Sequence, residues 1–447
     1  MFMKLTLSIV LQLCLFAAGA RAQFMGGTTI PVGEPVPSQT DPDKKWGASM
    51  GGNIGASAIT NPDTGKTEIF NQVALQPELS LYKLGVGLDL YLYFDSNGKV
   101  RGEDWDHSED WLSKIWYVRW AKKGDPLYAR LGGLSNVTIG HGFIMGGYSN
   151  RVRYPDTRRV GAELAFDAGW AGAEGMVGDL QNGSVNGGRV FVRPIYGSGL
   201  PVLKNTAVGV SAVMDRNPDG NRDVDSDQVA VYGADVELPI FTNDLISAKL
   251  YGDAAQMELG KYYTDRGVKN HGMGYAGGLL GKLLFLDWRA EMRSVDRNFV
   301  PNFFDGFYEI DRSSGTHKAA GLANSDTPRQ VGPYAQVYAN ILNLIKIGGT
   351  YEKMTNDPLQ IYPRVRGEAR TDPSLLMGKV DAAATYERRH VYNARQLGHT
   401  RNPDSVIAAE IAYHPNDNMR IVVVMKQTFD AYGTAVRTTQ VRSDVRF

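Results

Sequence analysis

The sequence has one cysteine, Cys14, and no excess of either charge, since 48 Lys and Arg balance 48 Asp and Glu. Cys14 lies in an apolar N-terminal segment, so a mature chain without that segment can form no disulfide, thiol nucleophile or sulfur-based zinc site. Balanced charge argues against binding nucleic acid through a basic patch. After residue 22 no apolar run approaches the roughly 18 residues of a membrane-spanning helix.

The N-terminus has the features of an export signal. Lys4 supplies a positive charge, Leu5–Ala18 is almost wholly apolar, and Ala20 and Ala22 fit a small-x-small cleavage site. We predict that residues 1–22 are a cleaved signal peptide.

The next segment, residues 23–45, is rich in proline and polar residues, which predicts a flexible tail. No domain boundary is visible after it, so residues 46–447 are expected to form one domain.

From Trp46 onward, apolar residues recur at every second position. Leu84–Phe94 is the clearest case, with Leu or Val at alternate positions and Gly, Asp or Tyr between them. This period favours strands over helices. The pattern recurs in segments of about ten residues, long enough for a tilted strand to cross a membrane, and short and long connections alternate.

We therefore predict an all-β protein, an antiparallel up-and-down transmembrane β-barrel of about 18 strands, with about 16 the main alternative. The alternation of connections fails within residues 355–387, where Leu359–Ala369 reads as either a strand or a loop. A soluble β-sandwich is the other fold compatible with the period.

The C-terminal segment Thr434–Phe447 resembles the closing strand of bacterial outer-membrane β-barrel (porin-like) proteins. It ends in Phe447 and carries Val445 and Val441 at alternate positions before it, although Ser443 and Thr439 are less apolar than the pattern requires. The resemblance indicates no subfamily. It implies an outer-membrane location, surrounding outer-membrane lipid, and insertion by the barrel-assembly machinery.

Charged residues occupy the face of these strands opposite the apolar one. If the apolar face meets lipid, the charged face lines a lumen too wide for side chains to fill. The predicted pore-lining residues on strands are Lys249, Asp253, Asp287, Arg289, Glu291 and Arg293. No segment after the tail looks long enough for a separate plug domain, so we expect a hydrated lumen.

Residues 139–161 combine a glycine-rich stretch with four arginines, Arg151, Arg153, Arg158 and Arg159. One interpretation is a loop folded into the lumen, where the arginines narrow the pore and attract anions. The alternative is a pair of solvated surface loops.

Asp215, Asn217, Asp219 and Asp223 place oxygen ligands at alternate positions, as in the first half of a calcium loop. The match stops there, because Ser226 stands where a bidentate Glu is needed. A plain hairpin turn at Asn217-Pro-Asp-Gly explains the same residues. Calcium is the only cofactor that the sequence suggests.

Catalytic signatures are missing, since the seven histidines form no His-Glu-x-x-His pair and no Gly-x-Ser-x-Gly elbow occurs. The expected function is a porin-like channel for passive diffusion of small hydrophilic solutes, without nucleic-acid partners. The alternatives are a non-transport barrel that acts through long loops and, third, a hydrolase at the barrel rim. The sequence does not indicate the oligomeric state.

Overall fold

The computed structural model describes residues 45–60, 67–94, 97–100, 102, 105–106, 108–152, 154, 158–181, 183, 185–200, 202–219, 226–243, 245–268, 271–313, 318–322, 329–356, 362–398, 405–429 and 435–446. The predicted signal peptide, and the predicted tail except Lys45, lie outside these residues.

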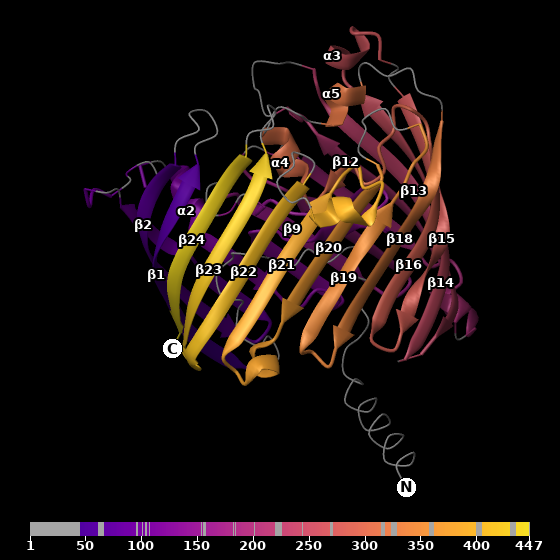
Figure 1. Cartoon of the computed structure of the whole chain (residues 1–447). Helices are drawn as coiled ribbons and strands as arrows, with labels where there is room; N and C mark the ends of the chain where they lie inside the picture. The colour runs from indigo at the N-terminus through magenta and orange to yellow at the C-terminus, as the bar shows by residue number, and fades with distance from the viewer. Residues whose placement is uncertain are drawn as a thin grey trace.

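The main structure is a closed antiparallel barrel (Figure 1). Each strand pairs with the next along the chain, and the first strand pairs with the last to close the ring. Its strands are β1 (Trp46–Thr60), β2 (Thr67–Leu81), β3 (Leu84–Leu88), β4 (Leu90–Phe94), β5 (Ile115–Trp120), β6 (Leu127–Gly132), β9 (Gly161–Asp167), β10 (Ala171–Val177), β11 (Val185–Val192), β12 (Ala207–Asp215), β13 (Val229–Thr242), β14 (Ile246–Leu259), β15 (His271–Leu283), β16 (Leu286–Val295), β18 (Gln330–Ile341), β19 (Ile345–Glu352), β20 (Arg364–Thr371), β21 (Val380–Arg388), β22 (Ser405–Asn416), β23 (Met419–Phe429) and β24 (Ala435–Arg446).

The barrel has 20 strands, so the predictions of about 18 and about 16 were wrong. β3 and β4 count as one strand interrupted at Asp89, because both pair with β2. β20 falls in the segment where the expected alternation fails. Its outer face carries Val365, Gly367 and Ala369, too little apolar bulk to mark a strand, and its pairing with β19 and β21 supplies the order that the sequence pattern does not show.

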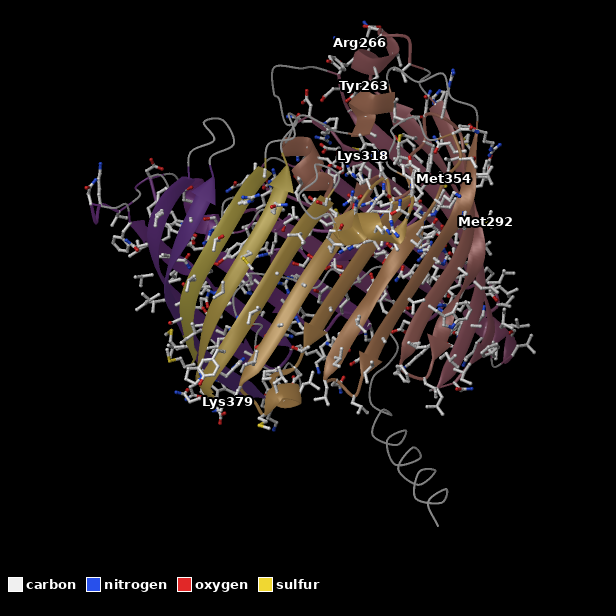
Figure 2. All side chains as sticks on the ribbon, viewed as in Figure 1. Tyr263, Arg266, Met292, Lys318, Met354 and Lys379 are labelled. Carbon is white, nitrogen blue, oxygen red and sulfur yellow. The ribbon has the colours of Figure 1, made fainter. Side chains whose placement is uncertain are left out.

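The outer face of the barrel is apolar because successive side chains of a strand point to opposite faces. Leu75, Val210 and Leu250 are each about half exposed on it, and Ile54 is 69% exposed. Met292 on β16 also points outward (Figure 2). The described part of the final strand has Val441 and Val445 on this face, at positions that alternate with the buried Arg442 and Asp444. Phe447 is outside the described residues.

Among the helices that the structure describes, none has the length and apolar character needed to cross a membrane. The helices are α2 (Ser108–Ser113), α3 (Lys261–Thr264), α4 (Tyr308–Ser313) and α5 (Lys318–Leu322), with 3-10 turns at Tyr196–Ser198, Leu203–Asn205, Pro373–Leu376 and Ala394–Gly398. In Figure 1, α3, α4 and α5 lie near the end of the barrel opposite the C-terminus.

Two segments leave the wall and fold inside the barrel. The first insert is the described part of residues 133–160, between β6 and β9, and the second insert is the described part of residues 296–322, between β16 and β18. They share a small sheet of β7 (Val137–Ile139), β8 (Met145–Tyr148) and β17 (Phe304–Asp305), in which β17 pairs parallel to β8.

The inserts pack against the inner face of the wall through one apolar cluster. Phe143, Phe299 and Phe304 from the inserts meet inward-facing Val213 and Met257 from the strands, and all five are at most 2% exposed. The expectation of a hydrated lumen with no plug was therefore wrong for this part of the barrel. The second insert is dense in aromatic residues, which is a sign of burial that the sequence itself carries.

Candidate functional site inside the barrel

His141 joins the first insert to the barrel wall. Its Nδ1 lies 3.0 Å from Asp253 Oδ1 and its Nε2 lies 3.4 Å from Glu237 Oε2. The imidazole also lies against the Tyr251 ring, with 4.5 Å between ring centroids. Burial opposes the charged form, but the hydrogen bonds to both carboxylates outweigh it and raise the pKa of His141 to about 9. The ring is therefore a cation at neutral pH, held between two acids.

The backbone beside His141 is held just as closely. Gly140 has a φ of 56° and its N–H donates to Glu174 Oε1 over 2.7 Å. A Cβ at this position would lie 3.2 Å from Arg189 Cδ, so glycine permits both the left-handed conformation and the close approach. Arg189 in turn donates two bonds to Asp235, at 2.8 and 2.6 Å.

Next to His141, a row of paired charges joins β16 to β19 across β18. Arg289 donates to the His141 carbonyl oxygen and to Glu291. Arg293 bonds both Glu291 and Glu352. Each guanidinium thus meets at least one carboxylate, and this pairing offsets the cost of burying the charges.

The second insert is fixed to the next strand of the wall, β20, through Asp305. This carboxylate accepts from Lys318 at 2.8 Å and from Arg364 at 2.6 Å. Burial would raise the pKa of Asp305, but the two cations lower it below its usual value. Arg364 also bonds Glu387 at 2.6 Å, so one arginine of β20 links the insert to β21.

Polar contacts also connect the two inserts. Tyr148 donates to Glu309 over 2.7 Å, and Arg159 pairs with the same carboxylate. Together with the shared sheet, these bonds make the inserts one packed body. Tyr308 ties that body to the wall, because it donates to Asp215 Oδ2 of β12 over 2.9 Å.

The end of the first insert forms a stack of guanidinium groups and aromatic rings. Arg151 lies 3.4 Å above Trp116 and 4.5 Å from the Tyr154 ring. Arg158 lies 3.3 Å above Tyr91 and pairs with Asp89. Such cation–π contacts stabilise a desolvated arginine.

This stack also reaches a distant part of the wall, because Lys426 of β23 donates to the Tyr154 carbonyl oxygen over 2.6 Å. The first insert therefore runs across the interior from the strands that hold His141 to β23.

Two small polar cavities lie where the inserts meet the wall. One, of about 40 Å³, is lined by His141, Arg289, Arg293, Asn302, Glu352 and Arg366. The other, of about 10 Å³, lies beside Asp89, Arg151 and Arg158. Each has room for water, and both are lined by charged side chains.

The predicted pore-lining residues on strands all project into the barrel: Lys249, Asp253, Asp287, Arg289, Glu291 and Arg293. Arg151, Arg158 and Arg159 lie in the first insert, as the interior-loop interpretation of residues 139–161 required, whereas Arg153 is outside the described residues. Sequence reasoning missed the partners Asp89, Asp305, Glu309 and Lys426. Of these four, only Asp89 could have been found from the sequence, because an acid between Leu88 and Leu90 points to the face opposite the apolar one.

Three of the four proposed calcium ligands, Asp215, Asn217 and Asp219, lie within the described residues. Asp215 is 0% exposed, accepts from Tyr308 and from the Asn217 backbone, and lies 3.8 Å from Arg312. No group of three or more described His, Cys, Asp or Glu residues is placed to hold a metal ion. Asp223 is outside the described residues, so calcium binding by Asp215, Asn217, Asp219 and Asp223 stays a prediction.

No protein-family model matches the chain, and no curated protein matches it. Several solved structures do. OccK2 (OpdF) of Pseudomonas aeruginosa, in complex with glucuronate, is 9% identical, with 91% of this chain and 98% of that chain covered and a TM-score of 0.34. A BenF-like porin from Pseudomonas fluorescens is 9% identical, covers 90% and 99% of the two chains, and has a TM-score of 0.35.

The outer membrane protein OprD of Pseudomonas aeruginosa is 9% identical, with 90% and 93% covered and a TM-score of 0.34. At these identities and TM-scores the likeness says nothing of this chain's solutes or activity. Outer-membrane porins are among its structural neighbours, and its own strand pairing makes this chain a closed β-barrel.

Proposed function

We propose that this chain is an outer-membrane channel for passive diffusion of small hydrophilic solutes. The observation that carries the proposal is a closed barrel with apolar side chains outside and paired charges inside. Lipid accepts a spanning sheet only when its edges are closed, and here β1 pairs with β24. The end with the C-terminus and the short turns would face the periplasm, and the end near α3 and α5 would face outward.

The solute path would follow the charged inner wall, because the apolar cluster fills the space between the inserts and β12–β14. The two polar cavities mark where the inserts and the wall leave room for water. The arginine stack and the His141 contacts would form the constriction.

Single-channel conductance of the refolded mature protein in a planar bilayer tests the proposal. Stable current steps that scale with salt concentration are the expected result, and heat-modifiable gel migration shows that the barrel has folded. A folded barrel that carries no current would contradict the channel. It would favour the second candidate, a closed barrel that acts through its outer loops. The dense packing of the inserts inside the barrel is the observation that supports this candidate.

The guanidinium groups would set ion selectivity, and a variant pair tests this. Arg158→Gln leaves the buried Asp89 carboxylate without its paired cation, so the reversal potential in a salt gradient should shift toward cations by several millivolts or more. The control is Arg158→Gln with Asp89→Asn, which removes both charges and should restore the wild-type value. Equal potentials in all three proteins would exclude this pair from the constriction.

A further inference from the structure

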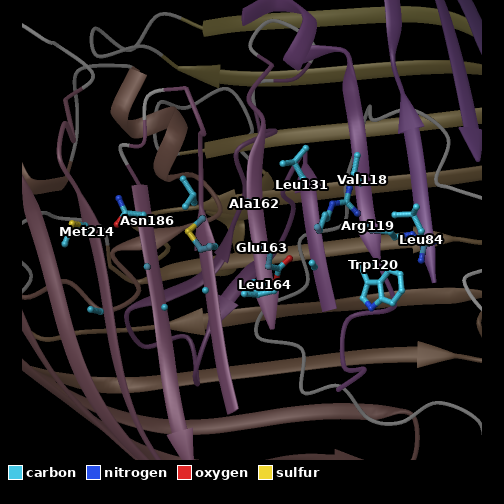
Figure 3. A pocket seen from close by; sticks show the side chains of 18 residues that line it. Leu84, Val118, Arg119, Trp120, Leu131, Ala162, Glu163, Leu164, Asn186 and Met214 are labelled. Atoms are coloured by element: carbon cyan, nitrogen blue, oxygen red, sulfur yellow. The ribbon is translucent and has the colours of Figure 1, made fainter. Parts of the chain in front are cut away.

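The outer face of the barrel has an apolar groove that the channel function does not use. It has a volume of about 820 Å³ and crosses the wall obliquely from β3 and β5 to β11 and β12 (Figure 3). The groove exists because the outward positions of neighbouring strands hold small residues. Gly175, Gly188 and Ala212 lie side by side in the register and form its floor. Ala129 and Ala162 are further small outward residues, Ala129 opposite Leu164 and Ala162 opposite Leu131.

Larger apolar residues also line the groove. Leu164, 54% exposed, stands between Ala129 and Gly175 in the register, and Trp120 is 43% exposed where β5 ends. The groove is therefore lined mostly by hydrocarbon and open toward the surrounding membrane. A long hydrocarbon chain fits such a shape, because it can make close van der Waals contacts with the apolar side chains that line the groove.

The two ends of the groove differ in charge. At the end near Trp120, the chain continues into the turn between β5 and β6, where Lys122 is exposed. The exposed Lys83 precedes Leu84 of the groove, and its carbonyl oxygen accepts from Ala121 N at 2.8 Å. Both lysines therefore lie at this end, whereas Asn186 and Met214 at the other end are uncharged. An occupant with one anionic end would bind in a single direction.

We propose that the groove binds one glycerophospholipid of the periplasmic leaflet, with an acyl chain on the small-residue floor and the phosphate near Lys122 and Lys83. This inference rests on the proposed membrane location. Trp at a membrane–water interface and Lys beside lipid phosphate are the usual arrangement at such a boundary.

Native mass spectrometry of the folded protein in mild detergent, with added palmitoyl-oleoyl phosphatidylglycerol, tests the site. We expect one retained lipid per chain. Gly175→Leu fills the groove, and a Cβ there meets nothing nearer than 3.4 Å, so folding should be preserved. The retained fraction should fall about tenfold. The matched control is Gly252→Leu, another outward glycine of the wall, where a Cβ has neighbours no nearer than 3.8 Å and binding should be unchanged.

Two charge-reversal variants test the orientation of the bound lipid. Lys122→Glu should weaken retention several-fold, whereas Lys379→Glu, at the same end of the barrel but on the β20–β21 turn, should not (Figure 2). Retention by Gly175→Leu equal to that of wild type would overturn the proposal. So would a wild-type oligomer that holds no lipid and becomes monomeric in Gly175→Leu, because a second copy would then occupy the groove. Conductance is measured separately, so a wild-type protein that carries current but retains no lipid contradicts this site alone and leaves the proposed channel standing.

Discussion

At the scale of single residues, the interior is organised by a few charged groups whose partners lie far away in the sequence. His141 meets Asp253 across 112 positions, and Lys426 meets the Tyr154 backbone across 272. Periodicity showed that Asp253 points inward, but no local pattern shows which insert residue it meets. Such pairs depend on where the inserts lie.

His141 should make the stability of the barrel depend on pH. Its folded pKa of about 9 lies above the ordinary histidine pKa of 6.5. The stabilisation is therefore complete below about pH 6.5, falls as pH rises, and is lost above about 9; its size is about 3 kcal/mol. Urea unfolding in detergent should show wild type losing more stability than His141→Gln between pH 7 and 10. Parallel pH curves for the two proteins would contradict this.

Asp305 should act as a structural anchor. Asp305→Asn leaves Lys318 and Arg364 facing a neutral amide in a buried site, so we expect a loss of about 3 kcal/mol, or local release of the second insert. Limited proteolysis within residues 306–322 distinguishes these effects. Asp287→Asn is the control, as a half-exposed acid of the same inner face outside the inserts. If Asp305→Asn resists proteolysis as well as Asp287→Asn does, Asp305 does not anchor the second insert.

At the scale of elements, the wall and the inserts differ in how far the sequence predicts them. Wall strands such as β3, β4 and β16 were predictable because an apolar outer face and a polar inner face impose a strict period of two. β20 was ambiguous because Gly367 and Ala369 stand where larger apolar residues would mark a strand. The small strands β7, β8 and β17 are only two to four residues long and form by packing inside the barrel, so they leave no period to read.

Removing the second insert should widen the channel. Replacing residues 299–322 with a short Gly-Ser linker takes away β17, Glu309 and Asp305, while β16 and β18 remain adjacent and paired. Single-channel conductance should rise at least twofold, provided that heat-modifiable migration shows a folded barrel. A linker inserted at the β20–β21 turn, with nothing removed, serves as the control. Unchanged conductance after the deletion would mean that the second insert lies outside the solute path.

At the scale of the whole molecule, barrel architecture was predictable and the filling of its interior was not. The outer face needs only an apolar residue at each second position, whichever residue it is. The interior depends on the volume left by 20 strands, and the strand count itself was underestimated. The apolar inner residues Val213, Val231 and Met257 look like weak lipid-facing positions until the inserts that cover them are known.

The pairing of β1 with β24 has a consequence for the order of assembly. Until the final strand is in place, the sheet has two unpaired edges and an exposed apolar face, a combination that invites polymerisation in water. A nascent or truncated chain without residues 435–447 would therefore be expected to need a holding chaperone, and closure of the ring would be the last step, taken at the membrane.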